Sequence, residues 1–373
     1  METATRPISE RRVLVGMSGG VDSSLAAALL LEQGNDVVGC FLKNWSDTKD
    51  ESGACAWRSE RRDALAVAAK LGIPLVTVDA EEVYRAAVVE PLYAEYAAGR
   101  TPNPDVRCNE FVKFPALAAE AKRQGCAWIA TGHYAQVRHP SRAGAEGESL
   151  LLQAADAEKD QTYFLCRLPQ KLLAQTLFPI GHLTKPQVRD EARRRGLPTA
   201  EKEESMGICF VGKVALPDFL RQRIPDAPGE IVSVDSAVLG RHGGVHRFTV
   251  GQRHGLGISA KGGSASGGGG GEPWYVVATD PASRRVVVSR NEQDLFSDQM
   301  QVGGARWIAA TPALPARLGV RIRHRQEIVA AEVTAVGDML RVRFSTPVRA
   351  ITSGQAAVFY DGDVCLGGGV IGG

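Results

Sequence analysis

The chain of 373 residues is 44% hydrophobic and 23% charged, with a formal net charge of +2 at pH 7. Such values are ordinary for a soluble globular protein, and the length predicts two or three domains. No apolar run reaches the roughly 18 residues that a membrane span needs, and the first residues lack the apolar core of a secretory signal. We therefore expect a cytoplasmic protein that does not contact a membrane.

Short β-branched runs alternate with helical patterns between Val13 and about Ala200. Strands are expected at residues 12–17, 36–42, 74–79 and 127–131, and helices near residues 21–33, 58–71, 81–98 and 109–123. Gly34, Gly72 and Gly125 stand where helix C-terminal caps are needed. This alternation is typical of an α/β fold with a doubly wound parallel sheet.

The pattern changes after about Lys213, where strand-like segments follow one another without a convincing long helix. The clearest are residues 230–234, 246–250, 274–278 and 285–289. We expect a small central domain with a flexible glycine-rich loop at 262–271, followed by a C-terminal β-barrel or sandwich. The predicted domains are residues 1–212, 213–285 and 286–373.

The stretch VGMSGGVDSS joins the first predicted strand to the first predicted helix. A helix N-terminus offers unpaired N–H groups and partial positive charge, and the two glycines let a phosphate approach the backbone. The serines add hydroxyl donors. Because the Walker lysine and its spacing are missing, this is not the usual nucleotide-triphosphatase loop. The alternative interpretation is that Asp22 or Ser23 only caps the helix.

The string SGGVDSS resembles the pyrophosphate loop of the ATP pyrophosphatases, which cleave ATP between its first and second phosphates and adenylate a substrate oxygen. Further motifs occur in the order found in the tRNA-specific 2-thiouridylases: TPNPDVRCN, ATGHYA, KDQTYFL, GICFVG, TVGQRHGLGI and FYDGDVCLGGGVI. This resemblance runs from Val13 to Ile371. It implies conversion of the wobble uridine of Glu-, Gln- and Lys-type tRNAs to 2-thiouridine, with ATP as substrate.

The resemblance also implies which residues bind ATP. They are Gly16, Met17, Ser18, Gly19, Gly20, Val21, Asp22, Ser23, Leu42 and Gly132. Leu42 and Gly132 lie at the carboxyl ends of predicted parallel strands, where ligands of open α/β sheets bind. Mg²⁺ is expected with the polyphosphate, held largely by phosphate oxygens and water, with Asp22 as a candidate ligand. No resident metal site is expected.

Thiolation needs a sulfur nucleophile, because the uridine C2 oxygen leaves only after ATP has adenylated it. A cysteine persulfide can attack the activated carbon, and a second cysteine can release the transferred sulfur and leave a disulfide. The resemblance implies that Cys209 carries the persulfide and that Cys108 is its partner. We expect Cys108 at the start of a helix, where the dipole favours a thiolate. The alternative is two buried structural cysteines; the seven scattered cysteines argue against a disulfide framework.

By resemblance, a third set of residues lies at the tRNA: Asn103, Pro104, Asp105, His133, Lys159, Asp160, Gln161, Arg323, His324 and Gln355. Amide and carboxylate groups can read a pyrimidine once it is unstacked. His133 has the alternative of an ordinary packed histidine. On a strand, Arg321, Arg323 and Arg325 share one face and form a phosphate rail, with a solvated face as the alternative. The family commonly has tyrosine where this chain has His324, so stacking there is a weaker expectation.

The implied partners are tRNA and a persulfide donor, either a cysteine desulfurase or a sulfur-relay protein. Two other functions stay open. One is another adenylating ligase or amidotransferase with the same ATP-cleaving loop, and the other is a tRNA-binding module without catalysis. The sequence also leaves open which tRNAs are used and whether Cys108 and Cys209 are within bonding distance.

Overall fold

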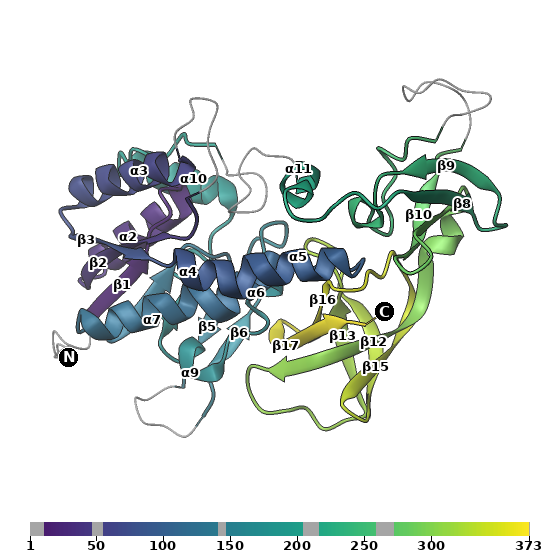
Figure 1. The fold of residues 1–373 in the computed structure, drawn as a ribbon. Helices are drawn as coiled ribbons and strands as arrows, with labels where there is room; N and C mark the ends of the chain where they lie inside the picture. The colour runs from purple at the N-terminus through teal and green to yellow at the C-terminus, as the bar shows by residue number, and fades with distance from the viewer. Residues whose placement is uncertain (1–10, 47–54, 141–146, 204–215, 259–271, 373) are drawn as a thin grey trace.

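The computed structural model describes residues 11–46, 55–140, 147–203, 216–258 and 272–372. An α/β domain lies at one end of the molecule and a β-barrel at the other, while the central strands lie above the barrel in the view of Figure 1. The helical run that contains α5 (Glu90–Ala97) extends from the α/β domain toward the barrel. The expected order of α/β domain, central domain and barrel is thus confirmed.

The α/β domain is built on a five-stranded sheet in the order β3-β2-β1-β4-β7. Its strands are β1 (Arg12–Gly16), β2 (Asp36–Lys43), β3 (Leu75–Asp79), β4 (Trp128–Thr131) and β7 (Thr176–Leu177), and every pair is parallel. Val13, Leu14 and Val15 are fully buried, because β1 is central and covered on both faces. The predicted parallel sheet is confirmed.

Helices connect these strands, and most follow the predicted ranges: α2 (Val21–Glu32), α3 (Ala56–Leu71), α4 (Glu81–Tyr84) running through a π-helical turn into α5, α7 (Phe114–Arg123) and α10 (Lys185–Arg194). The helix expected from residue 109 begins earlier, with α6 (Pro104–Cys108), and continues through a π-helical turn (Asn109–Lys113) into α7. Asn103 sets this earlier start, because its side chain accepts a hydrogen bond from Val106 N at 3.2 Å.

The C-terminal barrel consists of β12 (Phe296–Trp307), β13 (Ala316–Arg321), β14 (Val329–Val336), β15 (Met339–Arg349), β16 (Ala356–Asp361) and β17 (Val364–Ile371). The strand β12 pairs with both β15 and β17, which closes the barrel. Buried Leu340, Val342 and Phe344 alternate with exposed residues along β15, as the period of a strand requires.

The central domain holds the sheet β10-β11-β8-β9, formed by β8 (Gly229–Ser233), β9 (Val238–His242), β10 (Tyr275–Asp280) and β11 (Arg285–Ser289), and the helix α11 (Leu216–Arg221) precedes it. The strand predicted at 246–250 is wrong, because a short 3-10 helix occupies Val245–Arg247. Val245, His246 and Phe248 are all buried there, and that spacing suits a helical turn rather than an alternating strand.

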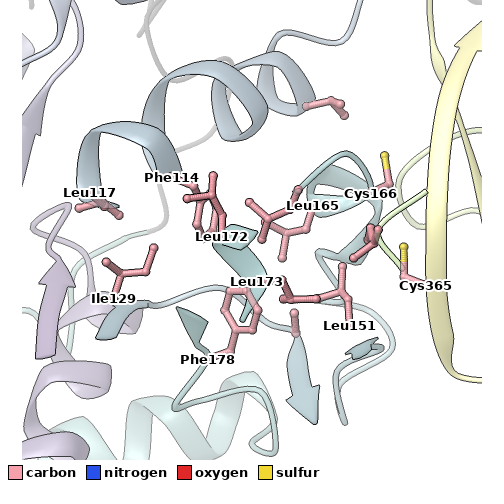
Figure 2. Packing of buried hydrophobic residues seen from close by; sticks show 14 of the residues in the cluster. Phe114, Leu117, Ile129, Leu151, Leu165, Cys166, Leu172, Leu173, Phe178 and Cys365 are labelled. Atoms are coloured by element: carbon pink, nitrogen blue, oxygen red, sulfur yellow. The ribbon is translucent and has the colours of Figure 1, made fainter. Parts of the chain in front are cut away.

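The α/β domain and the barrel share one hydrophobic core. Phe114, Leu117 and Ile129 belong to the same buried cluster as Cys166 and Cys365, and Figure 2 shows that cluster extending from α7 to the barrel strand. The hairpin β5 (Gln136–Arg138) and β6 (Leu150–Leu152) adds to this junction, because β6 pairs with β17. The barrel is therefore packed firmly against the α/β domain.

Candidate active site

The predicted phosphate loop is the connection between Gly16, at the end of β1, and Val21, at the start of α2. Gly19 has a φ of +74°, and a Cβ at this position would lie 2.2 Å from the Glu60 carbonyl oxygen. Only glycine fits such a conformation and such a contact. The loop is thus folded tightly against α3.

No side chain caps α2. Gly20 occupies the N-cap position, and the hydroxyls of Ser23 and Ser24 donate back to its carbonyl oxygen at 3.2 and 2.8 Å. The interpretation of Asp22 or Ser23 as a simple cap is therefore wrong. A helix that starts on glycine without a side-chain cap presents its first N–H groups to the loop, as anion sites do.

The carboxyl ends of three neighbouring strands meet at this loop. Leu42 lies near the end of β2, and Gly132 directly follows β4, on either side of β1. A Cβ at Gly132 would lie 2.5 Å from the backbone nitrogen of Ser23, so the glycine allows β4 to approach the loop closely. The structure brings the predicted ATP residues together, and their role in binding stays a prediction.

A partly buried ion pair that the sequence did not suggest lies beside the loop. Lys185 Nζ donates to both carboxylate oxygens of Asp22, at 2.8 and 2.9 Å, and the Tyr134 hydroxyl donates to Asp22 Oδ1 at 2.8 Å. Lys185 is only 8% exposed. No local pattern predicts this contact, because Asp22 and Lys185 are far apart in the sequence.

A second lysine also contacts the loop. Lys202 Nζ donates to the Gly19 carbonyl oxygen at 3.0 Å and to the Asp63 carboxylate at 2.6 Å. Glu60 lies next to these groups, and burial raises the pKa of its carboxyl. Two ammonium groups therefore lie at a loop that contains no lysine of its own.

Cys108 lies at the end of the first helical turn that follows Asn103, not at the helix start. Its thiol is buried, and burial raises its pKa, although the charge of Lys113 opposes the shift. Burial therefore opposes the thiolate form that the helix position was expected to favour. Tyr84, Val88 and Phe219 belong to the hydrophobic cluster that encloses it.

Cys209 lies outside the described residues. The described residues on either side of its segment are anchored at the two halves of the candidate site. Lys202 contacts the phosphate loop, and Phe219 of α11 packs in the cluster around Cys108.

The segment that leads into Cys108 is held by the barrel. Gln355 Nε2 donates to the carbonyl oxygens of Thr101 and Pro102, at 2.9 and 3.3 Å, and Thr101 N donates to Ser353 O at 2.9 Å. Gly354, with a φ of +90°, lies so close that a Cβ would be 3.0 Å from the Thr101 backbone. The barrel therefore positions the start of α6.

Three domain-family models match the chain in order. They are described as tRNA methyl transferase HUP domain (residues 11–213), tRNA methyl transferase PRC-barrel domain (217–290) and Aminomethyltransferase beta-barrel domain (297–371). A tRNA-specific 2-thiouridylase MnmA from Lactococcus lactis subsp. cremoris (strain MG1363) is 44% identical over 366 residues, 97% of this chain and 95% of that protein. The chain belongs to the tRNA-specific 2-thiouridylase family.

Other relatives support the assignment to the 2-thiouridylases. The proteins of the same name from Streptococcus sanguinis (strain SK36) and Geobacillus thermodenitrificans (strain NG80-2) are both 45% identical, over the same shares of both chains. Among solved structures, an NMN synthetase from Francisella tularensis has a TM-score of 0.33, with 19% identity over 52% of this chain and 66% of its own. A 4-thiouridine synthetase in complex with RNA and ATP has a TM-score of 0.36, with 15% identity over 57% of this chain and 50% of its own. Likenesses this weak support no inference.

Three of the positions at which the 2-thiouridylase resemblance implies tRNA contact are buried: Pro104, His133 and Asp160. His133 packs against Phe114 and Phe178, its Nδ1 lies 2.7 Å from Thr131 Oγ1, and burial lowers its pKa well below the ordinary value. This geometry favours the packed-histidine alternative. Asp160 is 1% exposed, and its carboxylate accepts from other groups of the protein. Contact of Asp160 with RNA stays a prediction.

Lys159 and Gln161 flank Asp160. Lys159 is half-buried, and the Gln161 side chain accepts a hydrogen bond from Tyr134 N at 2.9 Å. Asn103 caps α6, Pro104 is the first residue of that helix, and Asp105 lies in its first turn. Asn103, Pro104 and Asp105 therefore lie at the start of the helix that carries Cys108, and Gln161 contacts Tyr134. The contact of all these residues with tRNA stays a prediction.

Arg321, Arg323 and Arg325 do not form the phosphate rail that the alternation predicts. The strand β13 ends at Arg321, whose side chain is buried and donates to Asp160 at 2.7 Å. Arg323 Nη2 donates to Val250 O at 2.9 Å and to the Thr352 hydroxyl at 2.8 Å. The prediction of a phosphate rail is wrong, because the guanidinium groups of Arg321 and Arg323 donate hydrogen bonds to other groups of the protein. Direct RNA contact by Arg323 stays a prediction.

His324 lies beside aromatic residues of the α/β domain. Its ring centroid is 4.6 Å from that of Phe164 and 6.4 Å from that of Tyr163. Burial lowers its pKa to about 4, so the ring is neutral near pH 7. Stacking of this ring on an RNA base stays a prediction.

Across the described ranges, no helix has the length and apolar character to span a bilayer. Over the same residues, no three or more His, Cys, Asp or Glu side chains are grouped so that they could bind a metal ion.

Proposed function

We propose that this protein replaces the C2 oxygen of a tRNA uridine with sulfur, using ATP to activate that oxygen. The observation that carries the proposal is the match to proteins named tRNA-specific 2-thiouridylase over 97% of the chain. The tight glycine loop at the N-terminus of α2 and the cysteine of α6 supply the two kinds of site that such a reaction needs.

In the first step, the uridine O2 attacks the α-phosphorus of ATP. The bond to the β-phosphate oxygen breaks, pyrophosphate leaves with the electron pair, and the N3 proton is released to solvent. The N–H groups at the start of α2 hold the phosphates. Mg²⁺, when bound, neutralises phosphate charge. Since Lys185 contacts both oxygens of Asp22, phosphate oxygens and water fit better as its main ligands.

In the second step, the terminal sulfur of a Cys209 persulfide attacks C2, and AMP leaves with the original oxygen. The Cys108 thiolate then attacks the inner sulfur of Cys209. A disulfide forms between the two cysteines, the sulfur–sulfur bond of the persulfide breaks, and its electron pair stays on the sulfur that is now bonded to C2. A thiol reductant restores both cysteines, and a cysteine desulfurase or relay protein reloads Cys209.

We further propose the domain limits 1–212, 213–285 and 286–373, the wobble uridine of Glu-, Gln- and Lys-type tRNAs as the target, and a cytoplasmic location. The family models that match residues 11–213, 217–290 and 297–371 support the order of three domains, and the central one extends to residue 290 in its model. The packing of Gln355 against the segment before Cys108 supports a barrel that acts together with the α/β domain.

The test is to incubate the protein with ATP, Mg²⁺, a persulfide source and unmodified tRNA for glutamate, and to analyse the digested RNA by mass. We expect a uridine with one oxygen replaced by sulfur. Cys108→Ser and Cys209→Ser should each abolish it while pyrophosphate release survives, and Cys126→Ser, which is not part of the cluster around Cys108, should not. A gain of a methyl group instead would overturn the proposal in favour of the chemistry named in the family-model descriptions.

A further inference from the structure

The ion pair of Lys185 and Asp22 joins two helices that the sequence separates widely. Asp22 lies in the first turn of α2, at the phosphate loop, and Lys185 is the first residue of α10. The two ammonium–carboxylate distances of 2.8 and 2.9 Å place the charge of Lys185 at the N-terminus of α2. That end of α2 is where the phosphates of ATP are proposed to bind.

The position of Lys185 is set by packing on both sides of it. Val188 and Ala192 of α10 lie in one hydrophobic cluster with Val21 and Leu25 of α2. A capping box at Thr184 starts α10, and Lys185 N donates to Asp156 Oδ2 at 2.8 Å. The ammonium group is therefore presented to the loop by a fixed backbone, which lowers the entropic cost of using it.

The charges around the loop distinguish this lysine from Lys202. The ammonium of Lys202 is held by Asp63, which belongs to α3 and not to the loop, and by the Gly19 carbonyl oxygen. The partner of Lys185 is Asp22, and Tyr134 also donates to that carboxylate. If Lys185 turns toward a phosphate, Tyr134 still satisfies Asp22. The exchange therefore leaves the Asp22 carboxylate with a hydrogen-bond donor.

We propose that Lys185 binds the β-phosphate of ATP and neutralises the charge that develops there when pyrophosphate leaves. This inference rests on the proposed function and names a residue for its first step. As the bond between the α-phosphorus and the bridging oxygen breaks, the electron pair passes to that oxygen, which stays on the β-phosphate next to the ammonium. Lys185 thus supplies the cation that a Walker lysine supplies in other loops.

Two measurements on the full chain test this role: binding of the α,β-methylene analogue of ATP without tRNA, and pyrophosphate release with ATP and tRNA. For Lys185→Met we expect analogue binding at least about tenfold weaker and kcat for release lower by on the order of 100-fold. Lys185→Arg keeps the charge and should recover part of both. Lys122→Met, on the exposed face of α7, is the matched control and should change neither.

The double variant Asp22→Asn with Lys185→Met separates a phosphate ligand from a structural ion pair. If the pair only anchors α10, removing both charges restores the activity that Lys185→Met loses, and the proposal is overturned. Wild-type analogue binding by a folded Lys185→Met overturns it as well. If wild-type protein releases pyrophosphate and forms no thiouridine, the proposed function fails, whereas a defect of Lys185→Met in analogue binding still supports the lysine.

Discussion

The buried ion pair between Asp160 and Arg321 yields the sharpest prediction, because it connects the α/β domain to the barrel. The Asp160 side chain is 0% exposed and that of Arg321 8%, and their charged atoms lie 2.7 Å apart. The carboxylate also accepts from Ala154 N at 3.1 Å and from the Thr162 hydroxyl at 2.7 Å. Arg321→Met keeps these two hydrogen bonds and removes the cation.

The expected cost follows from the burial of both groups. Removing one partner of a buried pair leaves an uncompensated charge and costs about 3–5 kcal/mol. For a unit of 150–250 residues, that loss lowers Tm by on the order of 10 °C. The double variant Asp160→Asn with Arg321→Met removes both charges, so it should be more stable than Arg321→Met alone.

Calorimetry of the full chain measures Tm, and filter binding at several salt concentrations measures the tRNA contacts. We expect Arg321→Met to lower Tm and to leave the salt dependence of tRNA binding unchanged, because a guanidinium paired inside the protein releases no counterions from RNA. Arg341→Met, exposed on β15, is the control for Tm. An unchanged Tm with a weaker salt dependence would refute this reasoning and restore the phosphate rail.

Three further variants or measurements test the site. Gln355→Ala removes two hydrogen bonds to the segment before Cys108, each worth about 0.5–1.5 kcal/mol, so single-turnover sulfur transfer should slow roughly tenfold while pyrophosphate release persists. Burial raises the pKa of Cys108, so its alkylation near pH 7 should be at least about tenfold slower than that of a solution thiol and should increase as the pH rises above 9. Gly132→Ala places a Cβ 2.5 Å from Ser23 N, so binding of the ATP analogue should weaken at least about tenfold.

Each of these has a control and a contrary result. Gln301→Ala, exposed on β12, should not slow transfer, and a Gln355→Ala that only weakens tRNA binding would show that Gln355 contacts RNA. Cys108→Ser identifies the alkylated peptide, and rapid labelling at pH 7 would contradict the burial. Gly240→Ala is the control for Gly132→Ala, because a Cβ at Gly240 lies 3.7 Å from its nearest atom. An equal loss of ATP-analogue binding in both variants would contradict the inference that the close contact at Gly132 causes the loss.

Local patterns in the sequence predicted what depends on local contacts. The phosphate loop followed from its glycines and from its place between a strand and a helix, and the first strands followed from short β-branched runs. The pairing of β6 with β17 could not be predicted, because the sequence of a strand does not specify which other strand it pairs with. For the same reason Lys185 was missed, since only the packing of α10 on α2 brings it to Asp22.

A sequence motif can identify a candidate catalytic cysteine, but it does not predict how reactive the thiol is. The sequence motif marks Cys108 as a candidate nucleophile, but the reactivity of its thiol depends on residues such as Phe219, which a distant segment packs around it. A thiol that is buried and protonated does not attack a persulfide. The proposed attack by Cys108 therefore requires that this cluster open or that a group remove the proton of the thiol. Because Phe219 and Leu220 of α11 belong to the cluster, a displacement of α11 would change the burial of Cys108.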